Sequence, residues 1–151
     1  MESVIDTNVF VGALQRGDGV NRKILELCFL DELEPLMTDT LYYEYESLMG
    51  RSHLFEHSMF SQNERESFFD DFCSICRWVD IHYRWRPNLK DEGDNHVIEL
   101  AIAGGADCVL TWNKKDFRHA DLILPDIKVV TPVEFLQGQG QEKKETGSWQ
   151  H

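Results

Sequence analysis

The chain has 151 residues, 42% of them hydrophobic and 28% charged, which predicts one globular domain with a real core and excludes a largely disordered chain. No apolar run approaches the ~20 residues that a membrane-spanning helix needs, the N-terminal stretch does not resemble a signal peptide, and the four cysteines are too few for a disulfide scaffold, so a cytoplasmic protein is expected. The net charge of −12 repels nucleic acid in bulk, so a nucleic-acid enzyme of this composition needs a local basic patch, bound cations, or both.

Short apolar runs alternate with segments of helical periodicity along the chain. Strands are predicted at residues 2–5, 34–38, 78–83, 107–112 and 127–130. Helices are predicted at residues 8–15, 20–30, 41–50, 91–103 and 132–136, and a further helix begins at residue 63. This alternation predicts an α/β fold with a central parallel sheet of about five strands flanked by helices. The domain spans residues 1–136, and the Gly- and Gln-rich residues 137–151 are expected to form a disordered tail.

The helix that begins at residue 63 carries two local signals. Asn63 and Glu66 have the spacing of a capping box, and apolar residues continue at helical intervals to Val79. Cys73 and Cys76 lie within this helix without a second cysteine pair, so buried apolar side chains are expected there, not a zinc site or a redox pair. The residues just before this helix, around 53–59, are expected to form a loop.

Polar side chains follow the predicted strands at the edge where open parallel sheets bind ligands. Asp6 ends the first strand, and Thr111 and Asn113 follow the fourth strand. Asp116 comes shortly afterwards, and Asp94 lies in the first turns of the helix after the third strand. Because the carboxyl ends of parallel strands meet at one edge of the sheet, we expect these residues to lie close together.

Glu44 is the fourth acid of interest. Leu41, Glu44, Leu48 and Arg51 fall on one helical face by three- and four-residue steps. A carboxylate on an inward face needs a partner, because burying it alone costs several kcal/mol. That partner is either a metal ion or Arg51, whereas Glu46 points elsewhere and is expected to be solvated.

A divalent ion would remove the mutual repulsion of several carboxylates in one cleft. Oxygen ligands without a supporting His or Cys favour Mg²⁺ or Mn²⁺, which can activate a bound water for attack on a phosphodiester. Asp6 is then a metal ligand on a rigid strand end, while Thr7 and Asn8 cap the next helix or orient the ligand. The structural alternative is that Asp6 and Asp94 only cap the helices that follow them.

Four segments, taken in order, resemble the motifs of PIN-domain ribonucleases. They are VIDTNVF at residues 4–10, LYYEYESLMGR at 41–51, DEGDNHVIELAIAGGADCVLT at 91–111 and TWNKKDF at 111–117. Each motif is weak alone, but their order and spacing together are specific, and the third is the most telling.

The resemblance implies a PIN-like three-layer fold, a Mg²⁺ or Mn²⁺ cofactor and hydrolysis of RNA. It also implies the toxin component of a prokaryotic toxin–antitoxin pair (VapC-like), with an antitoxin protein as partner and a homodimer as the assembly. Carried over onto this chain, Asp6, Glu44 and Asp94 form the acidic triad. Many relatives have Asp where this chain has Asn113, so the fourth acidic position is either filled by Asp116 or left incomplete.

Further roles are expected around this triad. Thr111 hydrogen-bonds a ligand carboxylate or the substrate phosphate, or is an ordinary strand-end residue. Asp91 is either an outer ligand or an exposed acid at a helix start. Basic residues close to aromatic ones, or beside the fourth motif, could bind phosphate while the aromatic rings stack on bases; otherwise they are ordinary exposed loop residues. These possible RNA contacts are Arg51, Arg84, Arg86, Lys114 and Lys115.

Other functions fit the chain less well or remain open. A PIN-like module that binds nucleic acid or protein without cutting it is the main alternative, and Asn113 keeps it open. Haloacid-dehalogenase-like phosphatases need a second Asp two residues after the first, where this chain has Asn8, and receiver domains leave no role for Glu44. The histidines are scattered, and His96 is expected at the surface.

Overall fold

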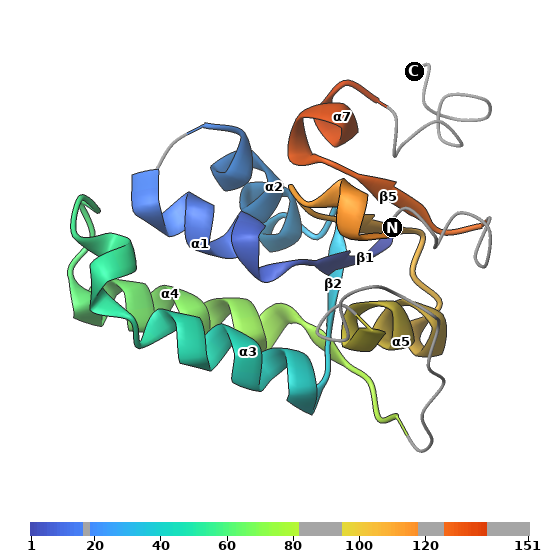
Figure 1. Ribbon diagram of the computed structural model, residues 1–151, viewed down its shortest axis with the longest axis horizontal. Helices are drawn as coiled ribbons and strands as arrows, with labels where there is room; N and C mark the ends of the chain where they lie inside the picture. The colour runs from blue at the N-terminus through green and yellow to red at the C-terminus, as the bar shows by residue number, and fades with distance from the viewer. Residues whose placement is uncertain (17–18, 82–94, 118–125, 139–151) are drawn as a thin grey trace.

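The computed structural model describes residues 1–16, 19–81, 95–117 and 126–138 (Figure 1). Its five-stranded sheet is parallel throughout, in the order β3-β2-β1-β4-β5. The strands are β1 (Glu2–Ile5), β2 (Glu34–Met37), β3 (Arg77–Trp78), β4 (Cys108–Leu110) and β5 (Lys128–Val130). The predicted α/β class with a parallel sheet of about five strands is therefore confirmed.

Helices cover both faces of this sheet. They are α1 (Thr7–Arg16), α2 (Val20–Phe29), α3 (Asp39–Met49), α4 (Gln62–Ile75), α5 (Asn95–Gly104) and α7 (Pro132–Leu136), with short 3-10 helices η1 (Ser52–Phe55) and η3 (Lys114–Phe117). Figure 1 shows α1, α2 and α7 on one side of the sheet and α3, α4 and α5 on the other, which gives three layers. In the described ranges, no helix is long and apolar enough to cross a membrane.

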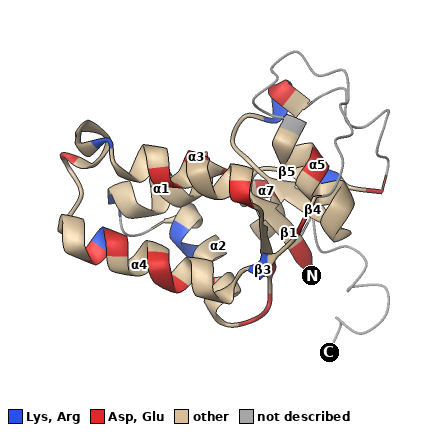
Figure 2. Ribbon diagram, turned by 90° about the horizontal axis from the view of Figure 1, so that it is seen from below, with Lys and Arg blue, Asp and Glu red and all other residues tan. Residues whose placement is uncertain are grey.

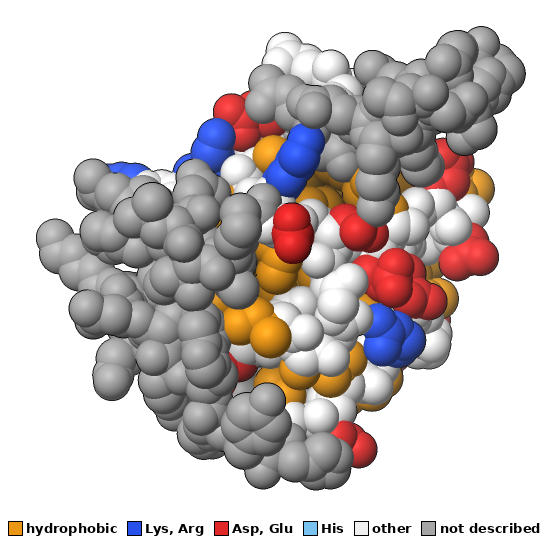
Figure 3. Space-filling model, turned by 90° about the vertical axis from the view of Figure 1, so that its right-hand side faces the viewer, with side chains coloured by type: hydrophobic (Ala, Val, Ile, Leu, Met, Phe, Trp, Pro, Cys, Tyr) orange, Lys and Arg blue, Asp and Glu red, His pale blue; other side chains and the backbone are white. Residues whose placement is uncertain are grey.

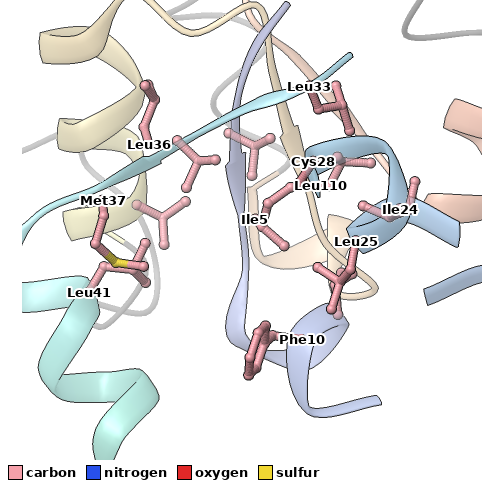
Figure 4. Packing of buried hydrophobic residues seen from close by; sticks show 14 of the residues in the cluster. Ile5, Phe10, Ile24, Leu25, Cys28, Leu33, Leu36, Met37, Leu41 and Leu110 are labelled. Carbon is pink, nitrogen blue, oxygen red and sulfur yellow. The ribbon is translucent and has the colours of Figure 1, made fainter. Parts of the chain in front are cut away.

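The core lies on both faces of the two central strands. Ile5 of β1 and Leu110 of β4 are almost fully buried, as the continuous apolar run of a central parallel strand predicts. Figure 4 shows side chains of β1, β2 and β4 packed between α2 on one side and Leu41 of α3 on the other. Because both faces of β1 and β4 are buried, the core holds these two strands in place. It thereby also sets the positions of the polar residues that follow their carboxyl ends.

Helix α4 begins with a capping box two residues earlier than the predicted one. Ser61 Oγ accepts a hydrogen bond from the Glu64 backbone N–H at 3.1 Å, and Glu64 Oε1 accepts one from the Ser61 N–H at 2.8 Å. The predicted box at Asn63 and Glu66 is therefore wrong. Both pairs have the required spacing, but Ser61 has the extended backbone of a cap, with φ −70° and ψ 166°. Figure 2 shows acidic residues along this helix, and its Asp and Glu side chains are exposed.

The end of α4 also differs from the prediction. The helix ends at Ile75, because Cys76 turns to an extended conformation, and Val79 lies beyond it. The strand predicted at residues 78–83 is shorter and earlier, at Arg77–Trp78, and residues 82–83 lie outside the described ranges. Pairing with β2 sets this position, since it joins Leu36 to Arg77 and Met37 to Trp78.

The cysteines behave as the sequence predicts. Cys28 and Cys76 are buried and Cys73 is half-buried, and all three are free thiols. Burial raises the pKa of the Cys73 thiol to about 11 and that of Cys28 to about 12. These thiols stay protonated at neutral pH, which suits packing residues rather than metal ligands or nucleophiles.

The loop expected around residues 53–59 contains the short helix η1.

A charged contact ties η3 to α7. Thr131 and Glu134 form a capping box, and Lys114 Nζ lies 2.9 Å from both Glu134 carboxylate oxygens. The hydrogen bond from the Thr131 N–H, followed by those from Lys114, lowers the pKa of Glu134. Because the pKa of Glu134 is lowered in the folded state, its ionised carboxylate stabilises the fold at pH values above the ordinary pKa of 4.5.

We expect Glu134→Ala to lower the free energy of unfolding at pH 7 by about 0.5–1 kcal/mol, because the cap and the ion pair are both lost. Glu134→Gln keeps the cap geometry and loses less. The difference in unfolding free energy between wild type and Glu134→Ala should be largest at pH values above 4.5, the ordinary pKa of the carboxyl. It should shrink as the pH falls through the lowered pKa of the folded state. Urea denaturation at several pH values measures it, and a pH-independent difference would contradict the ionic contribution.

Candidate active site

The candidate site lies where the order of the strands reverses. From β1 the chain builds outward through β2 and β3, and then returns to the other side of β1 for β4 and β5. The crevice outside the carboxyl ends of β1 and β4 is the usual ligand position in such sheets. The Asp6 N–H extends the ladder by donating to the Leu110 carbonyl at 2.9 Å, so Asp6 is the first residue past the strand.

The carboxylate of Asp6 is buried, since the residue is only 6% exposed, and both of its oxygens accept hydrogen bonds. Oδ1 accepts from the Thr7 N–H at 2.8 Å, and Oδ2 accepts from the Thr111 hydroxyl at 2.7 Å. A simple helix cap would instead accept from the second or third N–H of the helix. Val9, in that position, donates to the Asp6 backbone carbonyl at 3.0 Å. The side chain is therefore turned towards β4, and helix capping alone does not explain its placement.

Thr111 joins the ends of the two central strands. It is fully buried, and its hydroxyl oxygen accepts from the Asn113 N–H at 3.0 Å and from Asn8 Nδ2 at 3.3 Å while it donates to Asp6. Asn8 Oδ1 in turn accepts from the Trp112 N–H at 3.2 Å, and its Nδ2 lies 3.4 Å from Asp6 Oδ2. The hydrogen bond that was expected between Thr111 and a site carboxylate is present, and Asn8 helps to orient the same carboxylate.

Glu44 reaches the site from the other layer, on α3. The buried hydroxyl of its neighbour Tyr45 donates to the carbonyl of Ile5, and this contact holds α3 against the end of β1. Glu44 Oε2 lies 3.6 Å from His96 Nε2 on α5. Among the described residues, Glu44 therefore has the His96 imidazole within 4 Å, and no such contact joins it to Arg51.

The expectation that His96 lies at the surface is wrong. The residue is 8% exposed. Helix α5 is apolar on most of its surface and is covered on several sides, so even a polar residue in its first turn is enclosed. No local sequence signal marks this position, because the partner Glu44 is distant in the chain.

Acids from distant segments line one pocket of about 410 Å³. Its lining residues are Asp6, Thr7, Asn8, Glu44, Ser47, Leu48, Arg51, Asn113 and Asp116. Asp116 is placed by η3, whose first turn begins where the Asp116 N–H donates to the Asn113 carbonyl at 3.0 Å. Ser47 was missed in the sequence, although its position three residues after Glu44 puts it on the same helical face.

The electrostatics of the pocket centre on Asp6. Burial raises the pKa of the Asp6 carboxyl, the hydrogen bonds from Thr111 and Thr7 oppose this, and the charge of Glu44 raises it further. His96 acts in the opposite direction, but as the smallest of these contributions. An ionised carboxylate is thus held in a place that disfavours negative charge, and a bound cation would stabilise it.

Residues 2–115 match the model of the PIN domain family. The chain belongs to this family. PIN domains are in general nucleases that use divalent metal ions. An uncharacterized protein of Methanocaldococcus jannaschii, MJ1680, is 25% identical over 143 residues, which cover 89% of this chain and 88% of that protein.

The fold of this PIN domain resembles that of a solved complex. The crystal structure of VapBC2 from Rickettsia felis bound to a DNA fragment from their promoter has a TM-score of 0.56 and 17% sequence identity. The match covers 87% of this chain and 98% of the chain compared. It is a likeness of fold, and it agrees with the three-layer architecture described above.

Some of the expected site residues cannot be placed. Asp91, Asp94, Arg84 and Arg86 lie outside the described ranges, so their roles remain predictions. Lys114, an expected RNA contact, is paired with Glu134. On the face drawn in Figure 3, acidic and basic side chains are interspersed.

The oxygen ligands that this PIN domain offers in its pocket are of the chemical type that a hard divalent ion prefers. Asp6, Glu44 and Asp116 offer carboxylate oxygens and Asn113 offers an amide oxygen, which are ligands that Mg²⁺ and Mn²⁺ prefer. Within the described ranges, however, no three His, Cys, Asp or Glu side chains are grouped closely enough to hold an ion. Asp6, Glu44 and Asp116 thus line one pocket without forming an ion-binding group by themselves, and Asp94, the other expected ligand, lies outside the described residues.

Replacing Thr111 with Val should lower the free energy of unfolding at pH 7 by about 1–3 kcal/mol. The change keeps the shape of the side chain but removes the shortest hydrogen bond to the buried Asp6 carboxylate. Thr111→Ser is the matched control, because it retains a hydroxyl, and its loss should be smaller. Chemical denaturation measures both variants. A greater loss for Ser than for Val would show that the methyl group matters more than the hydroxyl.

Proposed function

We propose that the chain is a metal-dependent endoribonuclease that hydrolyses RNA phosphodiester bonds, with Mg²⁺ or Mn²⁺ as cofactor. Asp6, Glu44, Asp94 and Asp116 are its proposed metal ligands. The observation that carries the proposal is the convergence of Asp6, Glu44 and Asp116, from three distant segments, on one pocket at the reversal point of the sheet. Membership of a family of nucleases supports it.

The described residues of the pocket have different proposed roles in the reaction. When bound, the ion lowers the pKa of a coordinated water and neutralises charge on the scissile phosphate. Asp6 is held rigidly by Thr7 and Thr111 to bind the ion from the sheet side. Glu44 faces it from α3, and is partly exposed, so it can also accept a proton from the attacking water. Arg51 lines the same pocket and provides a positive charge for the phosphate of a substrate.

An aromatic residue next in sequence to a pocket residue could stack on an unpaired RNA base. Trp112 lies between two site residues in sequence and is 38% exposed. Its indole N–H donates to Asn21 Oδ1 at 2.8 Å, and its backbone N–H donates to Asn8, so the ring is held in place. A fixed, exposed aromatic face can stack on a base of any sequence, which suits single-stranded substrates.

We also propose that the protein acts as the toxin of a toxin–antitoxin pair, with an antitoxin protein as partner and a homodimer as the assembly. The four sequence motifs and the likeness of fold to VapBC2 support this role. The second candidate is a PIN-like binding module with little or no activity. Asn113 in place of an acid favours that reading, because the fourth ligand position is then left to Asp116.

We expect cleavage of mixed RNA in Mn²⁺ or Mg²⁺ that stops in EDTA, and about a 100-fold loss of rate in Glu44→Gln. Glu46→Gln is the matched control, since Glu46 lies on the same helix but is exposed and does not line the pocket. In a bacterial host, the wild type and Glu46→Gln should arrest growth and Glu44→Gln should not. No metal-dependent cleavage by the wild type would favour the binding module, and equal cleavage rates for the two variants would contradict the role of Glu44 as a metal ligand.

A further inference from the structure

Trp112 is an exposed aromatic residue that is restrained at both its backbone and its ring. Its backbone N–H donates to Asn8 Oδ1 at 3.2 Å, and Asn8 lines the acidic pocket. Its indole N–H donates to Asn21 Oδ1 at 2.8 Å, on helix α2, and yet the residue is 38% exposed. A large surface side chain loses rotamer freedom when it is held in this way, so a ring that is both fixed and open calls for an explanation.

Asn21 is itself held in place by the close packing of α1 and α2. A Cβ atom added to Gly12 of α1 would lie only 2.3 Å from Asn21 Nδ2, so the amide occupies the space that a side chain at this position would take. Asn21 is half-buried there. Gly12 therefore lets the Asn21 side chain lie against α1 and present its oxygen to the indole.

The charge of the pocket gives a fixed ring a use. The described lining residues include three carboxylates, on Asp6, Glu44 and Asp116, and one basic residue, Arg51, in a chain of net charge −12. Direct contacts between phosphates and basic side chains of the pocket therefore supply little affinity for RNA. A base stacked on an aromatic ring needs no positive charge, and one such contact gains about 5- to 150-fold in affinity.

We propose that Trp112 forms a subsite for one unpaired base of the RNA strand that enters the pocket, and that Asn21 is the positioning residue that holds its ring. The proposal rests on the ribonuclease function proposed above. Because every base has a π-face, the subsite accepts any base but requires that the base be unpaired.

Steady-state cleavage of a single-stranded RNA oligonucleotide in Mn²⁺ tests the subsite, with kcat and KM measured separately. Trp112→Leu should raise KM about 10-fold and change kcat little, because the stacked base adds affinity away from the reacting phosphate. Trp112→Phe keeps an aromatic ring and should lose less. Trp78→Leu is the matched control, since Trp78 is 47% exposed and lies on the edge strand β3, and it should leave both constants unchanged.

A double-mutant cycle tests whether Asn21 acts through the ring. Asn21→Leu keeps the approximate size of the side chain and removes the acceptor of the indole N–H, so KM should rise about 3-fold or more. In the Trp112→Leu background the same change should have no further effect on KM, because the ring is gone. Circular dichroism checks that each variant is folded.

The outcomes separate this inference from the proposed function. Cleavage by the wild type, with an unchanged KM in both Trp112 variants, would overturn the subsite and leave the ribonuclease function standing. Additive effects of Asn21→Leu and Trp112→Leu would overturn the positioning role of Asn21. If the folded wild type shows no metal-dependent cleavage, the proposed function fails together with the inference.

Discussion

A single buried carboxylate constrains the rest of the site. Asp6 follows directly from the central strand β1, and its two oxygens are fixed by Thr7 on its own helix and by Thr111 at the end of β4. The hydrogen bonds favour the ionised form, but burial and the nearby charge of Glu44 disfavour it, and the net effect is a raised pKa. The fold thus holds the Asp6 carboxylate where burial disfavours its negative charge, which a bound cation would stabilise. A metal ion in the pocket would be that cation.

The sheet order explains why this carboxylate is accompanied by other acids. Since β1 and β4 are adjacent while their connections leave in opposite directions, a crevice opens beyond their carboxyl ends. The segment after β4 brings Asn113 and Asp116 to one side of it. On the other side, the buried hydroxyl of Tyr45 holds α3 to the carbonyl of Ile5, which keeps Glu44 facing Asp6 across the layers. Core packing and site geometry therefore depend on the same few contacts.

Much of this could be predicted from sequence because the signals are local. The continuous apolar run of β4 marks a central strand, and parallel topology then places Asp6 and Asp116 at one edge; the inward position of Glu44 follows from helical periodicity. The burial of His96 could not be predicted, since α3 covers it from a distant part of the chain. The start of α4 could not be predicted either. Ser61 with Glu64 and Asn63 with Glu66 both have the spacing of a capping box, and only the backbone geometry distinguishes them.

Thermal unfolding of the wild type and Asp6→Asn, each in EDTA and in excess Mn²⁺, tests the central claim most directly. An ion that binds only the folded wild type at about 100 times its dissociation constant should raise its Tm by about 5–10 °C. Asp6→Asn should show little or no such shift, and in EDTA it should be at least as stable as the wild type, because the buried negative charge is gone. Equal Mn²⁺ shifts in both proteins, or none in either, would contradict the claim that Asp6 is held in place to bind a cation.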